Sequence, residues 1–299
     1  LLTLAASAAL ISSASAIVTI DYVTVGNAGN AADTTGFGAV AYEYQIGKYE
    51  VTNAQYGAFL NAKAATDSYG LYNSNMADLG ITRDGDLGSY TYSVTGGMEN
   101  RPVVYVSWFD AARMANWMVN GQGGGSTETG AYTLNGATSG TVLANAGAQV
   151  YIPTEDEWYK AAYYNAASQT YSLYPNGQNT ITAADANYGF SVGSSTDVGT
   201  YSGDASSYST FDQGGNVWEW NDELLGLSRG YRGGAWDSSS NNPVSNSRYD
   251  LRKSTRYGNG RSPEYEYVDL GFRIAAIPEP SSLVLTALFG AGLVCRRKR

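Results

Sequence analysis

The chain contains no histidine among its 299 residues, so imidazole chemistry is excluded throughout. Without histidine there is no Ser-His-Asp triad, no zinc-protease site and no iron site built on two histidines and a carboxylate. The only cysteine, Cys295, lies close to the C-terminus, so no disulfide and no thiol pair can form in the body of the chain. These absences remove the commonest nucleophilic and soft-metal sites.

Charged residues are also scarce, at 15% of the chain, and acidic ones outnumber basic ones by 27 to 18. A net charge of −9 disfavours contact with phosphate backbones, so we expect no nucleic-acid partner. Glycine (36 residues) and tyrosine (25 residues) are abundant instead, which is typical of the loop-rich, weakly charged surfaces of exported proteins. With 43% hydrophobic residues, the chain has enough apolar side chains to form a core.

Residues 1–16 are predicted to be a secretory signal peptide. An apolar run, Leu1 to Ile11, precedes a small-residue segment that ends in the Ala-x-Ala pattern cut by signal peptidase. No Met or basic region comes before the run, which indicates that the printed sequence starts inside the true N-terminus. The alternative is an apolar first helix of the domain.

The C-terminal residues 277–299 have three parts: Pro278-Glu279-Pro280, an apolar stretch at 281–294, and a basic cluster at 296–299. The apolar stretch is shorter than the roughly 20 residues that cross a bilayer, and the basic end would stay cytoplasmic. This order resembles the PEP-CTERM sorting signal of Gram-negative bacteria. The resemblance implies transient attachment to the inner membrane, cleavage by an exosortase, and release to the cell surface or extracellular matrix. A simple membrane anchor is the alternative.

Three segments of the predicted domain, residues 17–276, have a short strand followed by a capped helix. In each, Ser or Thr is followed three residues later by Gln, Asp or Glu, which is the capping box that opens a helix. The pairs are Thr52 with Gln55, Ser107 with Asp110, and Thr154 with Glu157, after strands predicted at 42–51, 102–106 and 150–153. Mixed strands and helices of this kind indicate an α+β protein.

Loops are predicted between these helices. Residues 121–147 are rich in Gly, Ser, Thr and Ala, and the strand-then-turn pattern at 132–136 indicates a hairpin insertion. Residues 163–210 have few apolar runs and predict little regular structure. Further strands are predicted at 17–25 and 270–275. No nucleotide-binding fingerprint is present.

The segment 211–220, Phe-Asp-Gln-Gly-Gly-Asn-Val-Trp-Glu-Trp, combines two carboxylates, a Gly-Gly turn and two indoles. The alternation of Trp218 and Trp220 with Glu219 predicts a short strand with one aromatic face, entered through a tight turn. Buried indoles would anchor the turn and hold oxygen atoms on its outer side. The alternative is a core strand with an ordinary glycine turn.

Six motifs, taken in order, resemble those of the sulfatase-modifying factor, or formylglycine-generating enzyme, family. They are residues 46–56, 101–108, 152–158, 215–220, 232–236 and 271–273. The resemblance covers about residues 42–275. It implies one α+β domain, a variant of the C-type-lectin-like fold with much irregular chain stabilised by calcium.

The resemblance also implies the calcium ligands, all of them oxygen atoms as a hard cation requires. One set consists of the side chains of Asp212 and Glu219 with the carbonyls of Gly215 and Val217. A second set would begin at Asn187 and include the Tyr188 carbonyl.

The oxidative residues of that family are missing. Formylglycine-generating oxidases need a Cys pair shortly after the Gly-Gly-x-aromatic motif to bind copper and attack the substrate cysteine, and residues 237–246 contain no cysteine here. Serine hydroxyls cannot replace a thiolate as soft-metal ligand or redox partner, so copper is not expected. Relatives that make ergothioneine use a histidine-based iron site, which this chain cannot build.

The first hypothesis is therefore an exported, non-catalytic binding module for a polysaccharide or a surface protein. Aromatic side chains suit such ligands, and Trp236, Arg248 and Arg252 are the predicted contacts, near the place of the lost active site. One alternative is an enzyme, either a formylglycine-type oxidoreductase or a hydrolase that uses carboxylates on exported proteins. Another is a structural component of the exopolysaccharide matrix.

Overall fold

The computed structural model describes residues 17–201, 203, 205–238, 251–255 and 260–278. The predicted signal peptide lies outside them, as do Glu279 and Pro280 of the sorting motif, whereas Pro278 is included. Within these ranges no helix is long and apolar enough to cross a membrane.

Three α-helices begin where the sequence predicts them: α1 (Asn53–Lys63), α2 (Trp108–Val119) and α3 (Glu155–Tyr163). Each has a complete capping box, in which the Ser or Thr side chain accepts from the third helical N–H and the third side chain accepts from the cap N–H. At α3, for example, the Thr154 N–H donates to Glu157 Oε2 over 2.8 Å. The capping boxes are therefore confirmed. A short 3₁₀ helix, η1 (Ser74–Leu79), follows α1.

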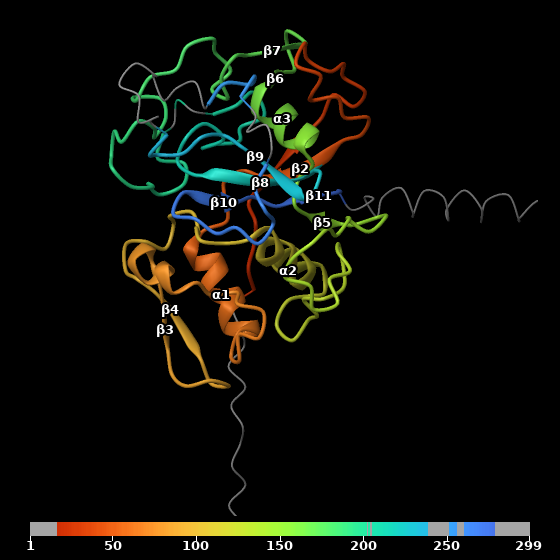
Figure 1. Ribbon diagram of the computed structural model, residues 1–299. Helices are drawn as coiled ribbons and strands as arrows, with labels where there is room; N and C mark the ends of the chain where they lie inside the picture. Colours follow the sequence, from red (N-terminus) through yellow and green to blue (C-terminus); the bar gives the residue numbers. More distant parts are fainter. Residues whose placement is uncertain (1–16, 202, 204, 239–250, 256–259, 279–299) are drawn as a thin grey trace, which may run out of the picture.

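Two sheets cross the middle of the molecule, with α1 and α2 on one side and α3 on the other (Figure 1). One sheet is antiparallel, with strand order β1-β2-β11-β5. The other has order β10-β8-β9, with β10 parallel to β8 and β9 antiparallel to it. The strands are β1 (Tyr22–Val25), β2 (Tyr44–Gly47), β5 (Val150–Tyr151), β8 (Trp218–Leu225), β9 (Ser228–Arg232), β10 (Leu270–Phe272) and β11 (Ala275–Ala276).

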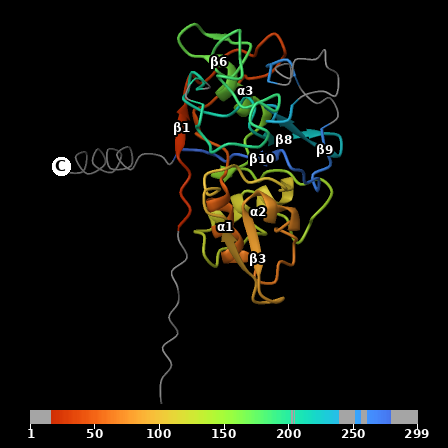
Figure 2. The same cartoon turned by 90° about the vertical axis from the view of Figure 1, so that its left-hand side faces the viewer.

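Two small hairpins flank these sheets at opposite ends of the molecule (Figures 1 and 2). The pair β3 (Ile81–Asp84) and β4 (Thr91–Val94) lies near α1, and the pair β6 (Tyr164–Asn165) and β7 (Thr170–Tyr171) follows α3. Most of the remaining chain is irregular, as predicted for 163–210. The α+β, C-type-lectin-like architecture is thus confirmed.

Three details of the prediction are wrong. Residues 102–106 form one isolated bridge, Thr52 to Pro102, because Tyr105 has φ 57° and turns the chain away. The insertion at 121–147 likewise has a single bridge, Tyr132 to Ala144, and no hairpin ladder. The predicted terminal strand is two strands, β10 and β11, which belong to different sheets and so connect them.

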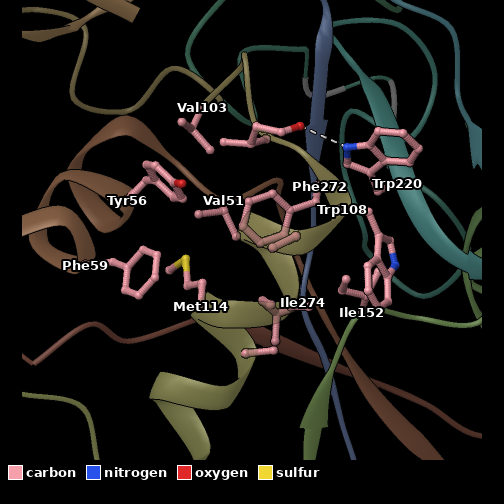
Figure 3. Packing of buried hydrophobic residues seen from close by; sticks show 14 of the residues in the cluster. Val51, Tyr56, Phe59, Val103, Trp108, Met114, Ile152, Trp220, Phe272 and Ile274 are labelled. Atoms are coloured by element: carbon pink, nitrogen blue, oxygen red, sulfur yellow. Dashed lines mark hydrogen bonds between the residues drawn. The ribbon is translucent and has the colours of Figure 1, made fainter. Parts of the chain in front are cut away.

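The core lies between α1, α2 and these sheets (Figure 3). Phe59 packs on Trp117 with ring centroids 5.2 Å apart, and the Trp220 indole donates to the Val106 carbonyl over 3.0 Å. Phe272 of β10 and Trp220 of β8 are fully buried. Burial of such aromatic side chains stabilises the fold by about 1.5–3 kcal/mol each. It fixes the position of β8 and of the turn that precedes it.

Candidate functional site

The turn at 211–217 has the backbone that its glycine and asparagine predict. Asp212, Gly215 and Asn216 all have positive φ, of 60°, 92° and 57°. A Cβ on Gly215 would lie 2.3 Å from the Asn187 carbonyl oxygen, so only glycine fits there. The Asn216 N–H donates to the same carbonyl over 2.8 Å. The structure thus brings the backbone of Asn187 against the turn, so the two predicted ligand sets adjoin.

Glu219 lies on β8, the strand that follows the turn, and its side chain is fully buried. Its carboxylate oxygens therefore do not lie on the outer side of the turn, where oxygen atoms were expected. Arg273 binds this carboxylate with both edges of its guanidinium: Nε lies 2.5 Å from Oε2 and Nη2 lies 2.5 Å from Oε1. The Trp158 indole adds a third bond to Oε2 over 2.7 Å. Arg273 also donates to the carbonyls of Gly47 (2.9 Å) and Phe211 (3.0 Å). One ion pair therefore connects four segments of the chain.

Two more carboxylates, Glu50 and Asp212, belong to this buried cluster. Glu50 Oε1 accepts from the Asn216 amide over 3.2 Å, and Glu50 Oε2 has no hydrogen-bond partner among the described residues. Burial raises the pKa of Glu50 well above its usual range, and the charges of Asp212 and Glu219 raise it further against the opposing effect of Arg273. Burial likewise raises the pKa of Asp212 to about 6.

Three carboxylates against one guanidinium leave the cluster short of positive charge. The raised pKa values of Glu50 and Asp212 favour protonation, which would reduce this imbalance. A hard cation would reduce it as well, because free carboxylate and carbonyl oxygens are the ligands that calcium prefers. The oxygens of Glu219, however, are already occupied by Arg273 and Trp158. Among the described residues, no three His, Cys, Asp or Glu side chains converge as a metal cage. The calcium ligands remain a prediction.

An aromatic pair lies where the missing oxidative segment begins. The rings of Phe190 and Trp236 meet edge to face with centroids 5.4 Å apart. The Phe190 N–H donates to the Trp236 carbonyl over 2.8 Å, and the Trp236 N–H donates to the Asn216 carbonyl over 2.9 Å. Phe190 is 53% exposed and has φ 57°, a strained conformation for an aromatic residue.

Two carboxyl groups, Asp237 and Asp269, meet next to this pair and share a hydrogen bond. Burial raises the pKa of Asp269 to about 7, the charge and hydrogen bond of Asp237 add to the rise, and Arg261 opposes it. The Arg261 guanidinium lies 4.3 Å from the centre of the Tyr265 ring, which stacks on Tyr267. An acid pair thus lies beside exposed aromatic rings.

The sequence prediction identified only part of this arrangement. Of the three predicted ligand contacts, Trp236 belongs to the aromatic pair. Arg252 instead donates from Nε to the Tyr174 hydroxyl over 3.1 Å. Arg248 lies outside the described residues. Tyr188 donates from its hydroxyl to the Ile181 carbonyl over 3.3 Å. The prediction missed Glu50. In the sequence, this residue is distinguished only by its position shortly before the capping residue Thr52.

It also missed Asp269, which pairs with Asp237 from a distant segment. No local pattern marks that pair, because its two residues lie far apart in the sequence. The Trp218 N–H donates to the Asp269 carbonyl over 2.7 Å and the Trp236 N–H donates to the Asn216 carbonyl over 2.9 Å, so both segments meet at the turn before β8.

Comparisons with known proteins place this geometry in a family. Residues 24–277 match the model of the sulfatase-modifying factor enzyme 1-like domain. Hercynine oxygenase from Mycobacterium tuberculosis is 27% identical over 186 residues, 59% of this chain and 37% of that protein. Hercynine oxygenase from Mycolicibacterium thermoresistibile is also 27% identical, over 61% of this chain and 36% of the relative. The chain thus spans little more than a third of these relatives' length.

Solved structures agree on the fold. The structure of CarF matches with a TM-score of 0.58 at 22% identity, over 88% of this chain and all of that one. Variable protein 1 of Treponema denticola matches with a TM-score of 0.54 at 21% identity, over 87% of this chain and 98% of that one. The chain therefore belongs to the sulfatase-modifying factor enzyme 1-like (FGE-sulfatase) domain family.

Proposed function

We propose that this protein is an exported, non-catalytic member of its family, which binds a polysaccharide or a protein of the cell surface or matrix. The aromatic pair of Phe190, which is exposed, and Trp236, which is half-buried, carries the proposal. Its strained backbone and exposed ring contribute nothing evident to folding, and such features gather at binding sites. Flat aromatic faces bind both sugar rings and protein side chains.

The proposed lack of the family's oxidative chemistry rests on the residues near that pair. Residues 237–246 contain no cysteine and the chain contains no histidine, so neither a copper site of thiolates nor an iron site of histidines can be built. The curated relatives are named as oxygenases of hercynine, and that activity is not transferred to this chain. Stoichiometric copper or iron in the purified protein would contradict this part of the proposal.

Export rests on the two ends of the chain. Signal peptidase and an exosortase are the proposed processing partners, with transient attachment to the inner membrane through the C-terminal helix. The proposed destination is the cell surface or extracellular matrix of a Gram-negative bacterium. Fractionation of cells with and without an exosortase tests this, and release of a shortened protein is expected only in cells that have one. Equal release from both strains would contradict it.

Calcium is proposed as a structural cofactor at the turn formed by residues 212–219. The surplus of buried carboxylates supports it, since Asp212 and Glu50 form no ion pair of their own in the part of the chain that the structure describes. A chelator is expected to lower the melting temperature, by about 2–4 °C per kcal/mol of binding free energy lost. An unchanged melting temperature would count against structural calcium.

The binding proposal is tested with a glycan array and a peptide array, each with and without chelator. The Trp236→Ala variant is expected to lose at least tenfold in affinity for the ligand found. The control is Leu227→Ala at the β8–β9 turn, where the side chain is 79% exposed. No saturable ligand on either array would favour a structural matrix component instead.

The paired carboxyls of Asp237 and Asp269 favour a second candidate, a hydrolase. Two adjacent carboxyl groups, one of which has a raised pKa, form the arrangement that acid–base hydrolysis uses. Hydrolysis of an exported polymer that Asp269→Asn abolishes, with folding intact, would establish this candidate over the binding module.

A further inference from the structure

A polar hollow, which neither Phe190 nor Trp236 lines, lies beside the β6–β7 hairpin. Figure 1 shows where this hairpin lies in the fold. It has a volume of about 590 Å³ and opens to solvent. The loop 27–34, the hairpin residues Tyr164 and 169–171, and Lys253 line it. Its volume lies within the roughly 300–1,000 Å³ of ligand pockets.

The charges in this hollow cancel. Among the described residues that line it, two are charged, Asp33 and Lys253. They form an ion pair with Nζ 3.0 Å from Oδ2 and 3.1 Å from Oδ1. The Tyr159 hydroxyl also donates to Asp33 over 2.6 Å. A phosphate, a uronic acid or a charged peptide would therefore meet no net opposite charge among the described lining residues, and a neutral ligand needs none.

The remaining lining suits hydroxyl groups and C–H faces together. Asn27 and Gln169 offer amide donors and acceptors, and the rings of Tyr164 and Tyr171 meet edge to face 5.0 Å apart. The polar share of this lining disfavours lipids. Sugar rings combine hydroxyl groups at their edges with apolar C–H faces, so they match both parts of the lining.

The walls are fixed before any ligand arrives. Asn30 donates from Nδ2 to the Gly38 carbonyl (2.6 Å) and to the Tyr171 hydroxyl (2.7 Å), which in turn donates to the Ala31 carbonyl (2.9 Å). Asn27 and Gln169 both have left-handed backbone, with φ 57° and 54°. Rigid walls reduce the entropy lost on binding.

We propose that this hollow binds a neutral oligosaccharide segment, as a second contact area apart from Trp236. This inference rests on the proposed binding function and names its ligand class and its position. Lys253 and Asp33 supply one donor and one acceptor side by side, which a pair of neighbouring sugar hydroxyls can bridge.

The test uses the full chain and a panel of neutral hexasaccharides: maltohexaose, cellohexaose, laminarihexaose and chitohexaose. Saturable binding of at least one is expected by calorimetry, with chemical-shift changes at the amides of Gln169 and Tyr171. Ala28→Trp and Ala32→Trp fill the hollow from exposed lining positions and are expected to weaken that binding at least tenfold. Ala77→Trp, an exposed alanine on η1, is the matched control and is expected to bind normally.

Unchanged binding in both filled variants, with melting temperatures equal to that of the parent, would overturn the inference. So would the absence of binding by every neutral sugar, or preference for an acidic oligosaccharide. Sugar or peptide binding that Trp236→Ala abolishes and Ala32→Trp does not would leave the proposed function standing and refute this site alone. No saturable ligand of any kind would refute both.

Discussion

Replacing Arg273 by Met should cost more stability than almost any other single change. The guanidinium is fully buried, bonds both oxygens of Glu219, and donates to the carbonyls of Gly47 and Phe211. Its loss leaves Glu219 buried without a cation beside Glu50 and Asp212. Removing one partner of a buried pair costs about 3–5 kcal/mol. At about 2–4 °C per kcal/mol, the melting temperature should fall by roughly 6–20 °C.

Urea denaturation with a constant slope measures this change in free energy. Lys48→Met is the control, because its pair with Asp21 spans 4.0 Å with side chains 30% and 67% exposed, and such pairs contribute little. The double variant Glu219→Leu with Arg273→Met should recover part of the loss, since apolar residues can replace a buried pair. A loss below about 1 kcal/mol for Arg273→Met would refute the view that this pair fixes the turn.

Three further predictions concern the turn and the aromatic surface. Gly215→Ala should lower the free energy of unfolding by about 1–3 kcal/mol, because Gly215 has φ 92° and an added Cβ would clash with Asn187. The control Gly96→Ala has open space around it and should change stability by under about 0.5 kcal/mol. Equal effects of the two variants would contradict the close approach of Asn187 to Gly215. Since the pKa of Asp269 is raised to about 7, the folded state retains a proton that the unfolded state releases. The contribution of Asp269 to stability therefore falls as pH rises from about 4 to about 7. Over that interval the free energy of unfolding, measured by urea denaturation, should fall less steeply with pH for Asp269→Asn than for the parent; equal slopes would contradict the raised pKa. Phe190→Gly should keep stability within about 1 kcal/mol because it relieves a left-handed backbone, yet weaken ligand binding; normal binding would remove Phe190 from the site.

Local chemistry made part of this fold predictable. Each capping box defined a helix start, and the Gly-Gly-Asn turn defined the entry to β8, because both depend on residues a few positions apart. The strand predicted at 102–106 does not form, because Tyr105 adopts a left-handed conformation. The residues around Tyr105 in the sequence do not predict this conformation. The acid pair of Asp237 and Asp269 could not be predicted either, because the two residues lie far apart in the sequence and meet only in the folded chain.

The most direct test of the central claim is to incubate the full chain with copper, calcium, oxygen and a cysteine-bearing peptide, and to analyse the peptide by mass spectrometry. A scaffold that retains the family fold without its thiols or any histidine should leave the peptide cysteine unconverted, while the same preparation binds its ligand. Conversion of the peptide cysteine to an aldehyde would contradict the account.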